Sequence, residues 1–152
     1  MVLNVSVVPR SPPVLAAALN FITVSSKLKG KNIEFLAQAF SESELSAINL
    51  IIAGYTNKRV IVKYKKSKNI KFIGKVNNLK DYFIGSDFFI SASLHEGMPN
   101  AVLEALSLGI PVILSDIPSH MEIFESTEFQ IGNIFNNNNF TCLVNKINEI
   151  IS

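Results

Sequence analysis

The chain has 152 residues and a formal net charge of +2, from 14 basic and 12 acidic side chains. Hydrophobic residues make up 48% and charged residues 17%, a balance typical of one globular domain that excludes an intrinsically disordered chain. The charge also argues against a nucleic-acid partner held by bulk electrostatics. No apolar run approaches the roughly 18 residues that span a bilayer. The start has no signal-peptide pattern and Cys142 is the single cysteine, so we expect a cytoplasmic protein.

Short apolar segments rich in β-branched residues alternate with segments of helical period from residue 20 onward. This alternation predicts βαβ units and therefore an α/β fold, a three-layer sandwich with a mainly parallel, Rossmann-like sheet. The predicted strands are Phe21–Val24, Leu50–Ala53, Lys71–Ile73, Phe88–Ser91 and Val112–Leu114.

Helices are predicted between these strands. Ile33, Leu36, Ala37 and Phe40 form one apolar stripe, and a second helix over Asn100–Leu108 ends at Gly109. Weaker patterns predict helices near Asn57–Lys65, Leu79–Ile84, Met121–Glu125 and Thr141–Ile151. The run Asn136–Asn139 is expected to be the loop that leads into the last helix.

The alternation of predicted strands and helices begins near residue 20 and is absent before it. Residues 1–19 contain Pro9, Pro12 and Pro13, which break regular structure, so we expect a linker or stub there. Residues 20–152 are expected to form one Rossmann-like domain.

The loop after the first predicted strand brings three lysines, Lys27, Lys29 and Lys31, to a helix N-terminus. This placement opposes the usual preference for acidic residues at the positive end of a helix. A bound anion reconciles the two, because backbone N–H groups and a lysine ammonium together bind phosphate. The alternative is an exposed loop whose lysines are merely solvated.

The loop after the fourth predicted strand, residues 95–100, opens the next helix. Gly97 permits close approach of a ligand to the backbone. Side chains lean toward the N-terminus of a helix, so Glu104 is expected to reach back toward the loop that contains Glu96. The simpler alternative is a helix cap at Asn100 and a favourable charge at Glu104.

This segment, FISASLHEGMPNAVLEALSLGIPVILSD, resembles the donor-site signature of group 1 glycosyltransferases. Glu96 and Glu104 match that family's two glutamates separated by seven residues. The resemblance covers roughly residues 20 to 125. It implies a retaining enzyme of two Rossmann-like domains, of which this chain corresponds to the C-terminal, donor-binding half. The expected partners are a nucleoside diphosphate sugar, as co-substrate, and a missing acceptor-binding domain or subunit.

The resemblance also assigns roles to residues. It makes Glu96 and Lys31 the catalytic residues, Glu96 hydrogen-bonding the hydroxyls of the sugar and Lys31 binding the phosphates. It implies that Glu104 binds the ribose of the nucleotide. The remaining donor-binding positions are Gly97, Met98, Pro99 and Asn100 at the pyrophosphate, and Gly74, Lys75 and Val76 near the base.

The chain departs from the family pattern before Lys31. Where the family has a Gly-Arg pair that contacts the diphosphate, this chain has Ser25 and Ser26. Lys27 or Lys29 would have to replace the arginine, although a lysine is not an equivalent array of donors. Lys27 is therefore included among the expected donor-binding residues.

Both histidines have weaker functional interpretations. His95 is adjacent to Glu96, but neighbours in an extended segment point in opposite directions, so a supporting role in the loop is favoured. His120 lies near Glu122 and Asp116 without a third ligand at a recognisable spacing, so we expect no metal site. No cofactor is expected besides the sugar donor.

Several alternatives remain open at this point. The chain could be a non-catalytic nucleotide-sugar-binding fragment or subunit, or an epimerase-like domain that takes the same ligands. A receiver-like signalling domain would need an acidic cluster after the first strand, where this chain has Ser25, Ser26 and Lys27. The lysines between residues 63 and 71 are expected to be a solvated face, with peripheral contact to anionic lipid as the minority interpretation.

Overall fold

The fold is described here from a computed structural model, which covers residues 18–42 and 47–152. Six strands form one sheet in the order β3-β2-β1-β4-β5-β6, and every neighbouring pair is parallel. The strands are β1 (Leu19–Ser25), β2 (Ile48–Gly54), β3 (Ile70–Gly74), β4 (Phe88–Ser91), β5 (Val112–Ser115) and β6 (Gly132–Phe135). From β1 the next two strands are added on one side of the sheet, and β4, β5 and β6 are added on the other side. Ligands of such sheets bind beyond the carboxyl ends of the strands, at the point between β1 and β4 where the strand order reverses.

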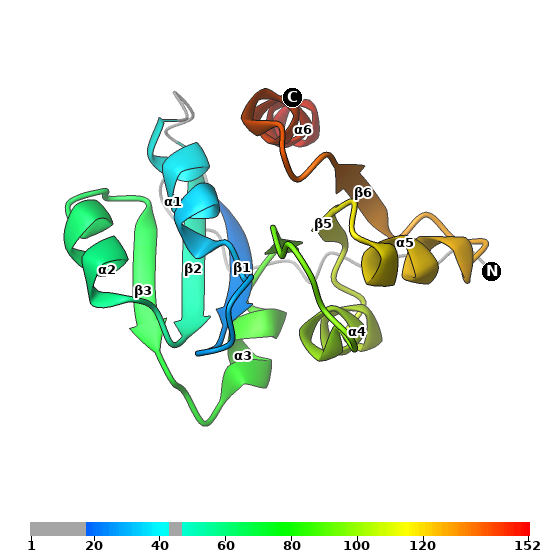
Figure 1. Ribbon diagram of the computed structural model, residues 1–152, viewed down its shortest axis with the longest axis horizontal. Helices are drawn as coiled ribbons and strands as arrows, with labels where there is room; N and C mark the ends of the chain where they lie inside the picture. Colours follow the sequence, from blue (N-terminus) through cyan, green and yellow to red (C-terminus); the bar gives the residue numbers. More distant parts are fainter. Residues whose placement is uncertain (1–17, 43–46) are drawn as a thin grey trace.

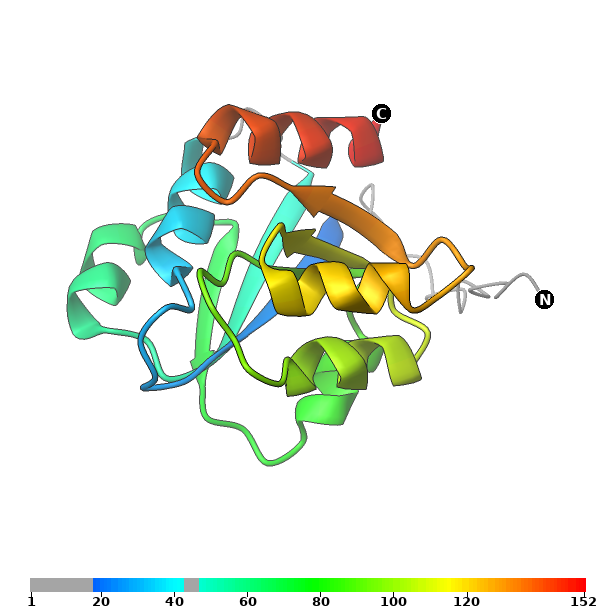
Figure 2. The same ribbon diagram turned by 45° about the vertical axis from the view of Figure 1, so that its right-hand side comes forward.

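Five helices connect the strands, a sixth follows β6, and together they cover both faces of the sheet (Figures 1 and 2). They are α1 (Ile33–Glu42), α2 (Lys58–Tyr64), α3 (Leu79–Ile84), α4 (Asn100–Ser107), α5 (Pro118–Glu125) and α6 (Phe140–Ile151). One apolar core joins α1, α2 and α6 to the sheet, and a second joins α3, α4 and α5 to it. The predicted three-layer α/β sandwich is therefore confirmed.

The predicted amphipathic patterns account for the core. Ile33, Leu36, Ala37 and Phe40 of α1 are all buried, and Val102 and Ala105 of α4 are buried in the second core. Gly109 follows α4 with a φ of +72°, a conformation that glycine adopts without strain and that ends the helix where predicted. The side chain of Asn139 accepts a hydrogen bond from the N–H of Cys142 and caps α6, which confirms the predicted loop at Asn136–Asn139.

Two elements differ from the prediction. Strand β6 was not predicted, because its sequence GNIF is short and buries only Phe135. Helix α5 begins at Pro118, three residues before the expected start at Met121, since proline fits the first turn, where N–H groups lack partners. The earlier start places His120 in the first turn of α5.

The predicted linker at residues 1–19 lies outside the described residues except at its end, where Leu19 begins β1. Within residues 18–42 and 47–152, none of the helices is long and apolar enough to cross a membrane.

Candidate functional site

The loops that follow β1 and β4 meet where the strand order reverses. We call them the β1–α1 loop (residues 26–32) and the β4–α4 loop (residues 92–99). The N–H of Leu94 donates a 2.8 Å hydrogen bond to the carbonyl of Gly30 and ties the loops together. The ring of His95 covers Gly30 so closely that a Cβ there would lie 2.5 Å from its Cε1. Glycine at position 30 therefore permits the two loops to approach.

Lys31 extends from this junction to the carboxylate of Glu96. Gly30 has a φ of +99° and Asn32 a φ of +55°, so the backbone turns sharply on both sides of Lys31. The ammonium of Lys31 donates to Oε1 of Glu96. The two side chains are only 22% and 12% exposed, so solvent screens this ion pair less than a surface pair. The two residues predicted to be catalytic are thus in direct contact.

His120 contacts the other oxygen of Glu96. Its Nε2 lies 3.2 Å from Oε2 of Glu96, and its side chain is fully buried. Burial alone would raise the pKa of Glu96, but hydrogen bonds from His120, Lys31 and Ser93 and the charge of Lys31 outweigh burial and lower the pKa to about 2. Glu96 is therefore an anion held between two basic side chains.

This lowered pKa predicts how stability depends on pH. Since the pKa of Glu96 falls from 4.5 in the unfolded chain to about 2 in the folded one, its stabilising effect is present above pH 4.5 and is lost as the pH falls toward 2. We expect the wild type to lose roughly 2–3 kcal/mol more stability than Glu96→Gln over this range. Urea unfolding at neutral pH and near the lower limit measures the difference. Glu125→Gln, an exposed change on α5, should behave as the wild type does. Equal pH dependence in Glu96→Gln and the wild type would contradict the lowered pKa.

Glu96 and Lys31 line a cavity of about 670 Å³ at the carboxyl edge of the sheet. We call it the acidic cavity because Glu104 faces it from α4, together with Glu96. Glu104 is exposed, and none of the ion pairs among the described residues includes it. Its carboxylate is therefore available to a ligand. Other residues predicted from the sequence that line this cavity are Lys29, Gly97, Met98 and Asn100.

Not every residue at the start of α4 has a backbone N–H group that is available to a ligand. Pro99 is buried, precedes the helix as its cap residue and has no N–H. The N–H of Asn100 donates to the carbonyl of Met98 at 2.9 Å. Of the predicted pyrophosphate residues, Gly97 and Met98 therefore keep N–H groups for a ligand, and Asn100 contributes as the first helical residue rather than as the cap.

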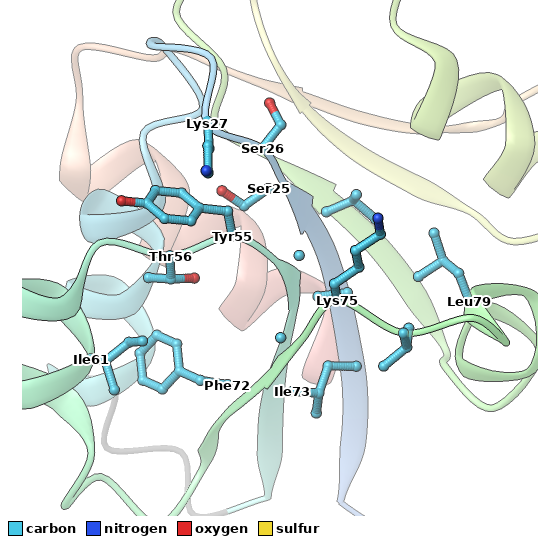
Figure 3. Close-up of a pocket in the computed structure, with 15 residues that line it drawn as sticks. Ser25, Ser26, Lys27, Tyr55, Thr56, Ile61, Phe72, Ile73, Lys75 and Leu79 are labelled. Carbon is cyan, nitrogen blue, oxygen red and sulfur yellow. The ribbon is translucent and has the colours of Figure 1, made fainter.

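A second cavity, of about 880 Å³, lies beyond the ends of β1, β2 and β3 (Figure 3). We call it the apolar cavity, since Ile61, Phe72 and Ile73 form much of its wall. It includes the three residues predicted to lie near the base, Gly74, Lys75 and Val76. Val24, Ser25, Ser26 and Leu79 line both cavities, so the two form one crevice along the edge of the sheet.

Lys27 lines the apolar cavity and, together with Lys31, a smaller cavity of about 240 Å³ at the start of α1. Its ammonium lies over the ring of Tyr55, 5.7 Å from the ring centroid, and it is absent from the lining of the acidic cavity (Figure 3). Lys29, by contrast, lines the acidic cavity. Of the two lysines weighed as replacements for the family's arginine, Lys29 therefore shares the acidic cavity with Lys31 and Glu96, and Lys27 does not.

Two site residues have no role in the sequence-based prediction. His120 is considered there only as a metal ligand, since the late start predicted for α5 hides its position in the first turn. Tyr55 follows β2 and contributes an aromatic wall beside Lys27. For Tyr55 the signal is its place directly after a predicted strand, at the edge where ligands bind, whereas His120 lies in the first turn of the helix that follows β5.

Comparisons with known proteins agree with this architecture. Residues 15–152 match the family model described as Glycosyl transferases group 1. The O-antigen biosynthesis glycosyltransferase WbnH of Escherichia coli is 30% identical over 103 residues, which cover 68% of this chain and 30% of the relative. The capsular polysaccharide biosynthesis glycosyltransferase CapH of Staphylococcus aureus is 32% identical over 125 residues, covering 74% of this chain and 35% of the relative.

A solved structure gives the same fold. Alr3699/HepE of Anabaena, in complex with UDP and glucose, superposes with a TM-score of 0.75 at 19% identity over 90% of this chain and 39% of that one. The chain spans about a third of the length of the curated relatives given above. The family match over residues 15–152, on a six-stranded parallel sheet with this crevice, shows that the chain belongs to the group 1 glycosyltransferase family.

Proposed function

We propose that this chain is the donor-binding half of a retaining glycosyltransferase that takes a sugar from a nucleoside diphosphate sugar. The observation that carries the proposal is the convergence of Lys31, Glu96 and Glu104 on one cavity at the reversal of strand order. Glu104 binds the ribose and Glu96 the hydroxyls of the sugar. Lys31, with the N–H groups of Gly97 and Met98, binds the diphosphate.

The same residues account for the chemistry. As the bond between sugar and phosphate breaks, negative charge grows on the diphosphate. A preorganised ammonium and backbone donors stabilise this charge more in the transition state than in the ground state. The proposal requires no metal ion or other cofactor, since Lys31 supplies the cationic charge.

UDP is the nucleotide we expect. HepE, whose fold is similar, is described in complex with UDP and glucose. The apolar cavity lies next to the acidic cavity and presents Tyr55, Phe72 and the backbone of residues 74–76 to a base. A planar base between aromatic and aliphatic walls fits such a cavity.

The ribose contact gives the test of this assignment. Glu104→Ala removes a charge-assisted hydrogen bond, and we expect the affinity for UDP to fall by about 1–3 kcal/mol, or roughly 5- to 150-fold. Glu125→Ala, an exposed change on α5, is the matched control and should leave the affinity unchanged. Isothermal titration calorimetry measures both variants. Equal affinities in wild type and Glu104→Ala would contradict the assignment, whereas UDP binding without transfer by the complete protein would favour a non-catalytic binding module.

An acceptor-binding domain or subunit is the proposed partner over the crevice. Leu28 and Met98, which line the acidic cavity, are 76% and 67% exposed, and Leu94, in the same loop as Met98, is 47% exposed. Large apolar side chains gathered at the rim of a polar site are typical of a surface covered by a partner. The acceptor would enter between this rim and that partner. The products we expect are polysaccharides or glycoconjugates, as in the named roles of WbnH and CapH.

We also propose peripheral contact of the protein with an anionic lipid surface through the edge formed by α2 and β3. Residues 57–80 contain nine of the 14 basic side chains and no Asp or Glu. All nine are exposed, and α2 and β3 form one edge of the molecule in Figure 1. Only Arg59 and Lys63 pair with an acid among the described residues, both with Glu34. The small net charge of the chain thus conceals a strongly basic edge.

Reversing charge on this edge tests the lipid contact. Each lysine near an anionic membrane contributes about 1 kcal/mol, so the triple variant Lys65→Glu, Lys66→Glu, Lys68→Glu should bind vesicles of mixed phosphatidylglycerol and phosphatidylcholine roughly 100-fold more weakly. Lys146→Glu, which lies outside residues 57–80, should bind as the wild type does. Vesicle co-sedimentation measures the difference. The proposal would be contradicted if the wild type bound vesicles of pure phosphatidylcholine as well as the mixed vesicles. It would also be contradicted if the triple variant bound the mixed vesicles as well as the wild type does.

A further inference from the structure

A buried network of hydroxyl groups lies behind Glu96. Ser91, Ser93 and Ser115 are at most 6% exposed, although they are polar. The hydroxyl of Ser115 donates to the carbonyl of Ser93 at 2.6 Å, and the hydroxyl of Ser91 donates to that of Ser93 at 3.1 Å. Buried polar groups are retained at low cost only when their hydrogen bonds are satisfied, so this network defines which atoms around it donate and which accept.

One ring nitrogen of His120 faces only acceptors. Its Nδ1 lies 2.9 Å from the carbonyl oxygen of Ser115 and 3.3 Å from the Ser115 hydroxyl oxygen. A carbonyl oxygen accepts but never donates, and the proton of the Ser115 hydroxyl is already directed at Ser93. Nδ1 must therefore carry a proton.

The other ring nitrogen faces an acceptor as well. Nε2 lies 3.2 Å from Oε2 of Glu96, and Glu96 is the only acidic side chain within ion-pair distance of His120 among the described residues. A carboxylate also accepts without donating. Because Nδ1 already holds a proton, the contact at Nε2 is favourable only when this nitrogen is protonated too, which makes the ring a cation.

We propose that His120 is held as an imidazolium and is a positioning residue that orients Glu96 toward the sugar of the donor. This inference rests on the proposed function for the role of Glu96, and on the contacts alone for the charge of His120. His120 is fully buried and lines neither cavity, whereas Lys31 is partly exposed and lines the acidic cavity. When Lys31 turns to the diphosphate, His120 keeps Glu96 ionised and in place. Lys31, His120 and Glu96 together carry a net positive charge before the diphosphate binds.

The first test measures the protonation of His120 directly and needs no ligand. The chain has two histidines, and His95 is exposed and forms no ion pair among the described residues, so it serves as an internal reference. At neutral pH an ordinary histidine is mostly uncharged. We expect ¹⁵N NMR of the imidazole nitrogens to show both nitrogens of His120 protonated under these conditions, and Glu96→Gln to remove this signature without altering His95. A neutral ring at position 120 in the wild type would overturn the proposal.

The second test separates positioning from folding. His120→Gln keeps a donor of similar length without the charge, and we expect it to weaken binding of UDP-glucose about tenfold or more while changing binding of UDP less than threefold. Equal losses for the two ligands would indicate a merely structural role and overturn the positioning assignment. If the wild type binds neither ligand, the proposed function fails, while the NMR result still decides the charge of His120. Circular dichroism of the variant confirms that it is folded.

Discussion

Replacing Lys31 with alanine should lower the affinity for UDP by about 10- to 100-fold. Lys31 is the only cationic side chain in contact with Glu96 besides His120 among the described residues, and it lines the acidic cavity together with Gly97 and Met98, where we place the diphosphate. A charge-assisted hydrogen bond in such a partly buried position contributes about 1.5–3 kcal/mol. The loss should be greater for UDP than for uridine, since uridine has no phosphate.

Two comparisons make this result specific. Lys66→Ala removes an exposed lysine after α2 that lines neither cavity, and it should leave UDP affinity unchanged. Lys29→Ala removes the lysine that lines the acidic cavity beside Lys31, and an intermediate loss would show that it replaces the family's arginine. Calorimetry with UDP and uridine provides the affinities. A change below twofold in Lys31→Ala would show that the diphosphate does not bind at this junction.

Replacing Gly54 with alanine should lower the free energy of unfolding by about 2–5 kcal/mol. Gly54 ends β2 with a φ of +90°, and a Cβ there would lie 2.0 Å from the carbonyl oxygen of Ser25 at the end of β1. Since the obstructing atom belongs to the backbone of the neighbouring strand, it moves only if the sheet edge itself shifts. That edge forms the wall shared by the two cavities, so UDP binding should weaken as well.

Gly109→Ala is the matched control for the conformational part of this cost. Gly109 also has a positive φ, of +72°, but a Cβ there would meet nothing within 4 Å. We therefore expect a cost of only about 1–2 kcal/mol, from the backbone conformation alone. Urea unfolding of both variants gives the difference. Similar losses in the two variants would show that the close approach of β1 and β2 is not needed for stability.

The pattern of the sequence predicts most of the sheet because its strands are buried on both faces. Phe21 and Ile22, neighbours on β1, are both fully buried, one in each core. Such strands appear as continuous apolar runs. Strand β6 lies at the edge and lacks such a run, and its first residue, Gly132, approaches the backbone of Val112 too closely for any Cβ. This tertiary constraint on Gly132 has no local signature.

In the candidate site as well, the sequence predicts the residues with a local pattern and misses the contacts that depend on the tertiary fold. Glu96 and Glu104 are predicted because their spacing along a loop and helix is local and specific. The contact between Lys31 and Glu96 joins residues 65 positions apart, and it follows from the parallel neighbours β1 and β4 rather than from either segment alone. His120 is not predicted to contact Glu96 because its position depends on where α5 begins. Lys27 is expected at the phosphates and stays a prediction, and its contact with the ring of Tyr55 has no signature in the sequence around either residue.

The most direct test of the donor-binding assignment is calorimetric titration of the chain with UDP, GDP and ADP. We expect one nucleotide, UDP, to bind with one-to-one stoichiometry and at least about tenfold more tightly than the other two, because the base occupies one shaped cavity. Binding of none of the three, or equal binding of all three that persists in Glu104→Ala, would contradict the assignment.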